Sequence, residues 1–451
     1  MNKYLLKTVR DNMPEFLKVV ANPLIRNRLI NNPHFKECFQ FLEERESRTQ
    51  NEILEFQFTQ LKNITTHAKN NVPYYNKLFK KAGFNPEKMN SFDDIKVVPY
   101  LTRELIQENF DQLISEKKVN GGYYQASTGG SSGSPLKVLL DYNSIFMENA
   151  FIYFYRKALN YTFSDKIVTF RGVKFDNTYY KLNPMYNEML FSPFRLSAKT
   201  ISLYLEKMNS YKPMYLHGYL SSIHFFTKLL SENNLKPNYK LKGIFLISEN
   251  IDNEKREYIE DYFNIKSSTF YGHSERCIIA REVLPKTYEF DPYYGYTELP
   301  DNENGTQTIV GTGFLNKTMP LIRYKTDDSA QKVEGGYKIV GKWKSNDGIY
   351  GKNMEYISHA SFNLHNQVLK NVLNYQFIQN EKGKVKILIV PNAKFETQEI
   401  PKIQHEFAKK TKGVIEFSVE VVDKLELSPR GKLDQFKRSI NSRQSSLVQT
   451  Y

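Results

Sequence analysis

A strand–helix–strand succession in the middle of the chain constrains its fold most. The apolar run LKGIFLIS (241–248) precedes NEKREYIEDYF (253–263), in which apolar residues recur at helical spacing, and SSTFYGHSE (267–275) follows as another strand and turn. Two strands joined by a helix lie parallel in one sheet, because the helix carries the chain back across it. Short apolar runs at 135–142 and 166–170 predict further strands. We therefore expect an α/β fold.

The sequence on either side of this unit has a different texture. The N-terminal part predicts helices broken by proline, such as EILEFQFTQLKNITTHAKNNV before Pro73. The C-terminal part predicts a helical stretch, a strand pair turning at Gly383, a helix and a strand, which together form a compact α+β unit. At 451 residues the chain exceeds what one core usually supports. We expect a large N-terminal domain with mixed sheets over 1–340 (mainly helical over 1–120), a hinge over 341–347 and a small mobile domain over 348–451.

Composition excludes several classes of protein. Hydrophobic residues make up 40% and charged residues 25% of the chain, which is typical of a globular protein and not of a disordered one. Cys38 and Cys277 stand far apart without a motif, which excludes a disulfide scaffold and a cysteine-rich zinc site. Charges interrupt every apolar stretch near the start, so neither a signal peptide nor a transmembrane segment is expected. We expect a cytoplasmic protein, with peripheral membrane association left open.

The excess of positive charge points to an acidic partner. Lysine and arginine number 63 against 49 aspartate and glutamate residues, which gives a net charge of +14. A nucleotide, a nucleic acid, a phospholipid surface and an anionic sugar are all compatible with this balance. The basic residues are spread along the chain without a dense run, so nucleic acid is not expected as a partner.

The segment ASTGGSSGSPLKVLLDY (126–142) is either a plain surface turn or a phosphate-binding loop. Strand-like sequence flanks it on both sides, which argues against an interdomain linker. Pro135 leads into a strand and no Gly-Lys-Ser/Thr follows, which excludes a Walker loop. Backbone N–H groups of a glycine-rich turn can form a nest for phosphate oxygens, and hydroxyl groups add donors. The candidate residues are Ser127, Thr128, Gly129, Gly130, Ser131, Ser132 and Gly133.

Three other stretches carry candidate site residues, each of them also compatible with an ordinary surface position. In TFYGHSER, Tyr271 ends an apolar run and could lie over a purine, and the Glu275 carboxylate could hold Mg²⁺ against phosphates. In MPLIRYKTDDSA, Asp327 and Asp328 follow a basic strand and could accept hydrogen bonds from ribose hydroxyls. In LSPRGKLDQF, Lys432 lies on a short Pro/Gly loop near the C-terminus.

In this order and at this spacing, the four stretches resemble the adenylate-forming superfamily of acyl-CoA synthetases and adenylation domains. The similarity points to the phenylacetate–CoA ligase-like branch, which includes CapK-type proteins of capsular-polysaccharide biosynthesis. It runs nearly end to end. VPYYNKLFKKAGFNPEKMNSFDDIKVVPYLTRELI resembles the opening helical region of that branch, KPMYLHGYLSSI and LKGIFLISENI its central segments, and GTGFLNKTMPLIRYKTDD its ribose-binding segment.

The resemblance implies a reaction and its participants. Such enzymes activate a small carboxylic acid with ATP and Mg²⁺, release pyrophosphate and form an acyl-adenylate, and most then pass the acyl group to a thiol, usually coenzyme A. An amine acceptor, giving an amide with an amino sugar or amino acid, is the alternative within this chemistry. An inactive nucleotide-binding scaffold protein is the alternative from another class. Neither the acid nor the oligomeric state follows from the sequence.

The resemblance also implies roles for individual residues. The loop from Ser127 to Gly133 would hold the ATP phosphates. The other cofactor-binding positions are Tyr271 and Gly272 at the adenine, Asp328 at the ribose, His273 beside them in the sequence and Lys342 at the hinge. Glu275 would ligate Mg²⁺, and Lys432 would meet the carboxylate and the α-phosphate, so these two are the catalytic candidates.

Several positions depart from the pattern of the family. The loop has one residue more than the usual Ser/Thr-Gly-Thr-Thr-Gly core, and Asp327 replaces the glycine that normally precedes the ribose aspartate. Lys342 stands where the hinge arginine is usual, so a planar bidentate donor is lost. The hinge aspartate corresponds to Ser345 by gapless counting, with Asp347 two residues further on.

The acyl pocket is only coarsely readable in the sequence. Candidates by position are FIYFY (151–155), RGVKFD (171–176), HGYLSS (217–222), Ser248-Glu249 and His273. The aromatic run is expected to be core, because such residues are mostly buried. Arg171 and His217 suit a polar or sugar-derived acid.

Overall fold

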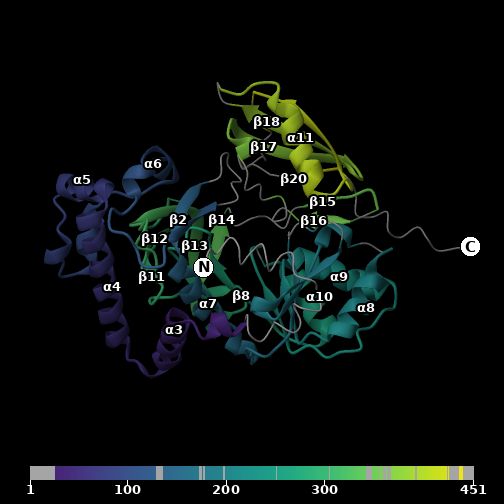
Figure 1. Ribbon diagram of the computed structural model, residues 1–451, viewed down its shortest axis with the longest axis horizontal. Helices are drawn as coiled ribbons and strands as arrows, with labels where there is room; N and C mark the ends of the chain where they lie inside the picture. Colours follow the sequence, from purple (N-terminus) through teal and green to yellow (C-terminus); the bar gives the residue numbers. More distant parts are fainter. Residues whose placement is uncertain are drawn as a thin grey trace, which may run out of the picture.

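The structure is a computed structural model in which a large α/β body carries a small α+β unit (Figure 1). It describes residues 26–127, 136–171, 175, 178–196, 199–249, 251–303, 305–341, 348–353, 355–358, 362, 367–391, 394–423, 425 and 436–439. The predicted fold class is confirmed: a helical N-terminal region, a large mixed sheet and a separate C-terminal sheet are all present.

The N-terminal helices follow the cap and proline signals of the sequence. They are α3 (Pro33–Glu44), α4 (Gln50–Asn71), α5 (Pro73–Ala82) and α6 (Arg103–Glu108). A capping box starts α4: Thr49 Oγ1 accepts a hydrogen bond from Glu52 N, and the Glu52 carboxylate accepts one from Thr49 N. Pro73 ends α4 and begins α5, as predicted. Apolar residues of α4, α5 and α6 pack on the antiparallel half of the main sheet.

One twelve-stranded sheet forms the centre of the large body. Its order is β11 (Gly295–Glu298), β12 (Gln307–Gly313), β13 (Tyr324–Val333), β14 (Gly336–Gly341), β10 (Thr287–Phe290), β9 (Ile279–Leu284), β8 (Ser267–Gly272), β7 (Gly243–Leu246), β6 (Tyr215–Gly218), β3 (Ile167–Phe170), β5 (Glu188–Phe191) and β4 (Tyr180–Asn183). The run from β8 to β5 is parallel, and the other pairs are antiparallel. β8 is therefore the seam between the two halves, since it pairs with β7 in parallel and with β9 in antiparallel.

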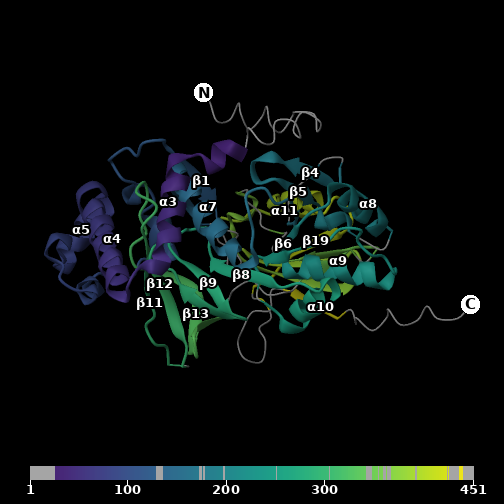
Figure 2. The same ribbon diagram turned by 90° about the horizontal axis from the view of Figure 1, so that it is seen from below.

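Helices α8 (Ile201–Tyr211), α9 (Leu220–Glu232) and α10 (Asn253–Phe263) accompany the parallel half, and α4 and α5 lie at the opposite end of the molecule (Figure 2). The predicted strand–helix–strand unit is confirmed as β7, α10 and β8. Asp252 is the N-cap of α10, and its carboxylate accepts a hydrogen bond from Lys255 N. Ile259 on this helix is fully buried in the core of the parallel half.

A β-hairpin lies beside the main sheet and leads into the Gly/Ser segment. β1 (Tyr123–Ser127) pairs in antiparallel with β2 (Lys137–Asp141), with Ser127 opposite Lys137. The strands predicted on both sides of the segment are therefore present, and the loop at 128–135 lies outside the described residues. Asp141 ties the end of the hairpin to the large body, because its carboxylate accepts hydrogen bonds from Lys317 N and Thr318 N.

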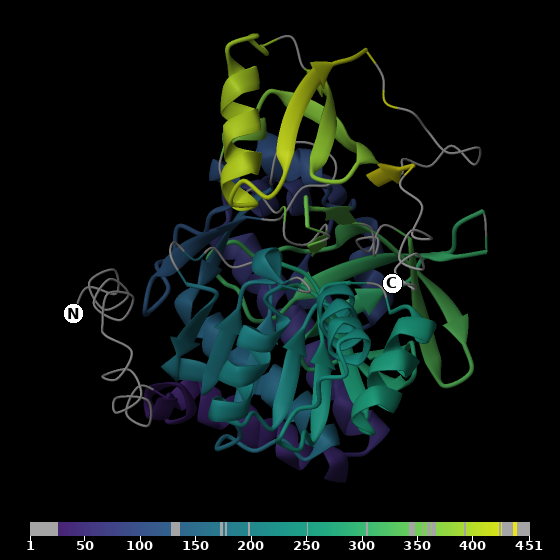
Figure 3. The same ribbon diagram turned by 90° about the vertical axis from the view of Figure 1, so that its right-hand side faces the viewer.

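The small unit has its own sheet and core. Its sheet, ordered β19 (Glu416–Val421), β18 (Lys384–Pro391), β17 (Val372–Glu381) and β20 (Phe436–Arg438), has α11 (Glu399–Lys410) beside it (Figure 3). The predicted turn at Gly383 is confirmed, and its φ of 74° is one that glycine adopts readily. Phe377 and Phe407 are buried between the sheet and α11.

One sequence prediction in this unit differs from the structure. Ahead of the strand pair we expected a helical stretch, whereas the described residues there form the hairpin of β15 (Gly348–Tyr350) and β16 (Tyr356–Ser358) and a short 3₁₀ turn at Gln367–Leu369. Tertiary packing decides this segment: Ile349 and Ile357 face each other in the hairpin register and are both fully buried. No helix within the described ranges is long and apolar enough to cross a membrane.

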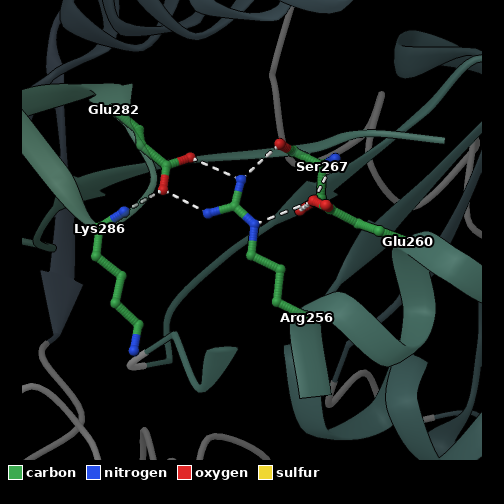
Figure 4. Close-up of polar contacts among 5 residues, drawn as sticks. All are labelled: Arg256, Glu260, Ser267, Glu282 and Lys286. Carbon is green, nitrogen blue, oxygen red and sulfur yellow. Dashed lines mark hydrogen bonds and ion pairs between the residues drawn. The ribbon is translucent and has the colours of Figure 1, made fainter. Parts of the chain in front are cut away.

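A buried ion-pair network joins helix α10 to strands β8 and β9 of the main sheet (Figure 4). Arg256 of α10 donates to both carboxylate oxygens of Glu282 on β9, at 2.6 and 3.1 Å, and to the carbonyl of Ser267 at the start of β8, at 2.7 Å. Its Nε donates to Glu260, which also accepts from Ser267 N. Burial alone would raise the pKa of Glu260, but the hydrogen bonds from Ser267 and the guanidinium of Arg256 lower it. The network thus fixes β8 against α10 and β9.

Removing the central cation should destabilise the fold strongly. Arg256→Met leaves two largely buried carboxylates without their partner, and breaking a buried pair in this way costs about 3–5 kcal/mol. We expect the free energy of unfolding in urea, followed by far-UV circular dichroism, to fall by that amount. Lys255 precedes Arg256 and forms a partly exposed ion pair with Asp252. Lys255→Met removes this pair and should cost about 1 kcal/mol or less. Equal losses in the two variants would contradict the assignment.

Candidate active site

The carboxyl end of β8 is the place where the parallel and antiparallel halves of the sheet meet. Ligands of open α/β sheets bind outside the carboxyl ends of strands, where the strand arrangement changes. Tyr271 and Gly272 are the last two residues of β8. The chain then turns, with Arg276 N donating to His273 O at 3.1 Å and Arg276 at a φ of 54°. This turn places Glu275 next to the end of the strand.

Strand β13 holds the end of β8 through two tyrosine–carboxylate contacts. The Tyr271 hydroxyl donates to Asp328 Oδ2 at 2.9 Å, and the Tyr324 hydroxyl donates to Glu275 Oε1 at 2.9 Å. Tyr324 and Asp328 are an even number of residues apart on β13, so their side chains lie on the same face. Two segments far apart in the sequence are thereby brought to one point.

The structure distinguishes the two adjacent aspartates. Asp328 is largely buried and faces Tyr271, whereas Asp327 is exposed and belongs to the other face of β13. Burial raises the pKa of Asp328, although the hydrogen bond from Tyr271 acts in the opposite direction. Asp328 is also the register partner of Gly341 at the end of β14, so the segment predicted as a hinge begins beside it.

Glu275 is buried and ionised. Burial alone would raise its pKa, but His273 and the hydroxyl of Tyr324 outweigh burial and hold the pKa at about 2. His273 Nδ1 lies 3.1 Å from Glu275 Oε2, and its Nε2 lies 3.7 Å from Cys277 Sγ. Burial alone would lower the pKa of His273, but Cys277 and Glu275 together raise it well above its ordinary value. The turn after β8 therefore offers a carboxylate whose orientation is set from two sides.

The residues present fit a magnesium ion held together with a nucleotide. Among the described residues, no group of three or more histidine, cysteine, aspartate or glutamate side chains could hold a metal ion by itself. Mg²⁺ in nucleotide sites is typically bound by one or two carboxylates together with substrate phosphates, so a single ionised carboxylate suffices. Each carboxylate oxygen of Glu275 accepts one hydrogen bond and keeps lone pairs for a further ligand.

The structure brings together part of the predicted set. Tyr271, Gly272, His273, Glu275 and Asp328 gather at the carboxyl end of β8. The loop residues Thr128, Gly129, Gly130, Ser131, Ser132 and Gly133, together with Lys342 and Lys432, lie outside the described residues.

The hairpin that carries Ser127 approaches this turn. The ring of Tyr124 on β1 lies 5.9 Å from the guanidinium carbon of Arg276, the residue that follows Glu275. The strand leading into the Gly/Ser loop is therefore adjacent to the turn that carries the metal candidate.

Comparison with known proteins agrees with this geometry. The structure aligns with the crystal structure of 2-hydroxyisobutyryl-CoA ligase in complex with 2-HIB-AMP and CoA in the thioesterification state, with a TM-score of 0.57 at 15% identity over 88% of this chain and 92% of that chain. A second structure of that ligase, in the postadenylation state with R3-HIB-AMP, aligns with a TM-score of 0.50 at 15% identity over 86% and 89% of the two chains. The chain has the fold of the acyl-CoA ligases.

The sequence comparisons point to one branch of this fold. Residues 349–439 match the family model of the CapK C-terminal domain. Protein CapK of Staphylococcus aureus is 23% identical to this chain over 401 residues, which cover 85% of this chain and 88% of CapK. The predicted resemblance to CapK-type proteins is thus confirmed.

Two neighbours of the candidate site were missed by the sequence reasoning. Tyr324 orients Glu275, and Glu148 on α7 (Tyr142–Arg156) pairs with Arg276 at 2.6 Å. The even spacing of Tyr324 and Asp328 along a strand indicated that Tyr324 lies on the same face as the candidate Asp328. Nothing in the sequence pairs Glu148 with Arg276, because strands β3 to β8 separate them along the chain.

The aromatic run expected to be core is core. Phe151, Tyr153 and Phe154 are buried in one cluster, and Tyr155 donates its hydroxyl hydrogen bond to Asp291.

His217, a candidate for the acyl pocket, belongs to a buried polar network of the parallel half. Thr169 on β3 donates to Glu188 Oε1 on β5, and its hydroxyl lies 3.0 Å from His217 Nδ1 on β6. Asn183 donates to the other oxygen of Glu188 at 2.8 Å. Burial alone would raise the pKa of Glu188, but His217 and Arg171 outweigh it and lower the pKa to about 2. Burial lowers the pKa of His217 to about 4. At neutral pH the carboxylate is therefore ionised and the imidazole is neutral.

This network should make stability depend on pH in a defined window. The pKa of His217 is about 4 in the fold against an ordinary 6.5, so the unfolded chain takes up the proton first as the pH falls. Folding stability should drop between pH 6.5 and 4, and this single group contributes about 3 kcal/mol over the window. We expect His217→Gln to remove that part of the pH dependence in urea unfolding.

The comparison isolates His217 from the other titrating groups. His224, whose pKa burial also lowers to about 4, is present in both proteins and cancels in the difference. His34→Gln, the same substitution at the exposed start of α3, is the matched control. Parallel pH profiles of the wild type and the His217 variant would show that the imidazole is not buried in its neutral form.

Proposed function

We propose that the protein is an ATP-dependent ligase that activates a carboxylic acid as an acyl-adenylate and transfers the acyl group to the thiol of coenzyme A. The observation that carries the proposal is the arrangement at the end of β8. There the ionised Glu275 accepts a hydrogen bond from Tyr324 of β13, and Asp328 of β13 accepts one from Tyr271 of β8. The fold supports it, since the aligned crystal structures of 2-hydroxyisobutyryl-CoA ligase contain an acyl-AMP, one of them together with CoA.

In the first half-reaction, a carboxylate oxygen of the acid attacks the α-phosphorus of ATP and the bond to pyrophosphate breaks. We propose that the loop from Ser127 to Gly133 holds the phosphates, and that Asp328, oriented by Tyr271, accepts hydrogen bonds from the ribose hydroxyls. Mg²⁺ bound at Glu275 would neutralise phosphate charge. The cation of Lys432 would offset the repulsion between the carboxylate and the α-phosphate, so the chain's contribution is mainly positioning and charge neutralisation.

In the second half-reaction, the thiol sulfur attacks the acyl carbon, the thiol proton is lost and AMP leaves. We propose that residues 1–340 form the large domain and 348–451 the mobile domain, with 341–347 as the hinge. Gly341, the register partner of Asp328, puts the start of this hinge beside the ribose candidate. Lys342 would then follow the movement and contact the nucleotide in one of the two positions.

The likeness to CapK supports a place for this reaction in surface or capsular polysaccharide biosynthesis. An amine acceptor, giving an amide with an amino sugar or amino acid, is the outcome that would replace the thiol. The two are told apart by the product: mass spectrometry after incubation with an activated acid detects either an acyl-CoA or an amide.

The metal role of Glu275 gives the first test. With a panel of carboxylic acids and ATP, we expect the wild type to release pyrophosphate only when an acid is present. Glu275→Gln keeps the shape but removes the charge that faces the metal, so turnover should fall by about a hundredfold or more and the Mg²⁺ concentration for half-maximal rate should rise. A pyrophosphate assay at increasing Mg²⁺ measures both.

The surface substitution Glu289→Gln is the matched control, since Glu289 pairs with Arg281 away from the site. It should retain wild-type turnover. An unchanged Mg²⁺ requirement in Glu275→Gln would remove Glu275 from the metal site, and acid-independent pyrophosphate release in the wild type would contradict the ligase proposal itself.

Lys432 should matter in one half-reaction only. A placed cation of this kind is typically worth about 3 kcal/mol of barrier, and each 1.36 kcal/mol is about tenfold, so Lys432→Ala should slow acyl-adenylate formation by roughly a hundredfold or more. ATP affinity should hardly change, because most nucleotide contacts lie in the large domain. With pre-made acyl-adenylate the variant should transfer the acyl group to coenzyme A at a near-normal rate, because the small domain has rotated.

Lys384→Ala provides the control from the same unit, because Lys384 forms an exposed pair with Glu381. Both half-reactions should proceed normally in this variant. Equal losses in the two half-reactions of Lys432→Ala would mean that the lysine supports the fold, and the two-position mechanism would lose its basis.

A further inference from the structure

Two arginines beside the candidate active site contain buried nitrogen atoms without a hydrogen-bond partner. Within the part of the chain that the structure describes, neither Arg171 Nε nor Arg276 Nη1 has a partner, and both atoms are shielded from solvent. Buried polar groups in folded proteins nearly always have a hydrogen-bond partner, and a charged donor without one costs folding free energy. Two such donors near one site therefore call for a ligand that supplies acceptors.

Both arginines belong to the carboxyl edge of the parallel half. Arg171 follows Phe170, the last residue of β3, and Phe170 is in register with Gly218 at the end of β6. Arg276 lies in the turn after β8, next to Glu275. Because the carboxyl ends of parallel strands lie at the same edge of a sheet, the two side chains start from the edge at which the adenylation candidates gather.

The charges of both arginines act on one buried tyrosine. Tyr186 lies in the 3₁₀ turn Pro184–Tyr186, between β4 and β5. Burial raises the pKa of its hydroxyl, whereas both Arg171 and Arg276 act on the same hydroxyl to lower it. Both guanidinium charges are therefore close enough to act on one buried hydroxyl, although more than a hundred residues separate them along the chain.

The nearby carboxylates do not fill the two open positions. Glu148 engages Arg276 through Nη2, at 2.6 Å, and leaves Nη1 without a partner. Glu188 accepts hydrogen bonds from Thr169 on one oxygen and from Asn183 on the other. The two cations thus have nearby countercharges, and what is missing is a pair of hydrogen-bond acceptors.

We propose that Arg171 and Arg276 recognise an oxygen-bearing acyl group, so that the acid activated by this protein carries hydroxyl groups or a second carboxylate in addition to the carboxylate that reacts. The oxygen atoms of that group accept hydrogen bonds from Arg171 Nε and Arg276 Nη1. This inference rests on the proposed ligase activity and adds to it the chemical class of the substrate and the residues that select it.

A plain aliphatic or aromatic acid would leave both donors buried and unpaired. Sites built to hydrogen-bond a substrate discriminate strongly against an analogue that lacks the polar group, because the polar groups of the site are then left without partners. We therefore expect an oxygenated acid to be preferred over its plain counterpart by at least about a hundredfold in kcat/KM.

The test compares acids of equal carbon number in the wild-type protein. Butyrate, 3-hydroxybutyrate and succinate form one series, and hexanoate, gluconate and adipate form a second. Pyrophosphate release with ATP and Mg²⁺ gives kcat/KM for each acid, and the two oxygenated arms separate hydroxyl from carboxylate recognition. Because this comparison needs no substitution, it does not depend on the folding of a variant.

Two variants and a control assign the preference to the arginines. Arg276→Lys keeps the charge and loses the planar fork, and Arg171→Met removes the donor, so each should reduce the oxygenated-to-plain ratio by about tenfold or more. Arg281→Met, on an exposed pair with Glu289, should keep the wild-type ratio. The thermal unfolding midpoint in the presence of each acid without ATP supplies a readout of binding that needs no turnover.

The outcomes separate the inference from the proposed function. Plain acids used as well as oxygenated ones, or an unchanged ratio in both arginine variants, would overturn the inference and leave the ligase activity standing. A midpoint raised by oxygenated acids in the wild type and in Arg281→Met, but not in Arg171→Met, would support the site even without pyrophosphate release, in which case the ligase proposal fails. If no oxygenated acid raises the midpoint and none supports pyrophosphate release, the inference is overturned.

Discussion

The ion pairs of Arg256 fix the strand on which the rest of the site depends. β8 pairs in parallel with β7 on one side and in antiparallel with β9 on the other, and it joins the two halves of the main sheet, so its position decides how they meet. Arg256 binds the first residue of β8 and, through Glu282, the strand beyond it. A buried cation with two carboxylate partners tolerates little displacement, since any lost contact leaves a buried charge unpaired. Because the strand is fixed at its start, Tyr271 and Gly272 at its other end are also held in position.

The opposite end of β8 is held by hydrogen bonds to carboxylates that the proposed chemistry uses. Tyr271 and Tyr324 each donate to an acidic residue, Asp328 and Glu275, and neither tyrosine can take up another arrangement without removing a hydrogen bond from a buried carboxylate oxygen. Positioning groups in this way makes a reaction between two anions feasible, because the charges are neutralised by groups already in place. Stability and function therefore draw on the same contacts.

Two polar clusters of the parallel half differ in how completely they are satisfied. In the first, Glu188 receives hydrogen bonds on both oxygens and His217 stays neutral, so the cluster is closed and stabilises the sheet. In the second, Arg171 and Arg276 each have one buried donor without a hydrogen-bond partner among the described residues. A closed network needs nothing from outside, whereas an open one next to a candidate active site is completed by a ligand. A core cluster and a binding surface thus differ in whether every buried donor and acceptor has a partner within the protein.

The sequence by itself determined the local elements and the family likeness. Caps, prolines and periodicity predict α4, α5, α10 and the strands around them, because these signals act within a few residues. The motif order identified Tyr271, Glu275 and Asp328 as candidates. Only the tertiary structure decided that Asp328 and not Asp327 faces Tyr271, that Tyr324 orients Glu275, that Glu148 meets Arg276, and that a hairpin precedes the last sheet. Those facts depend on strand pairing and on burial, which arise from contacts between residues far apart in the chain and leave no periodic signal in it.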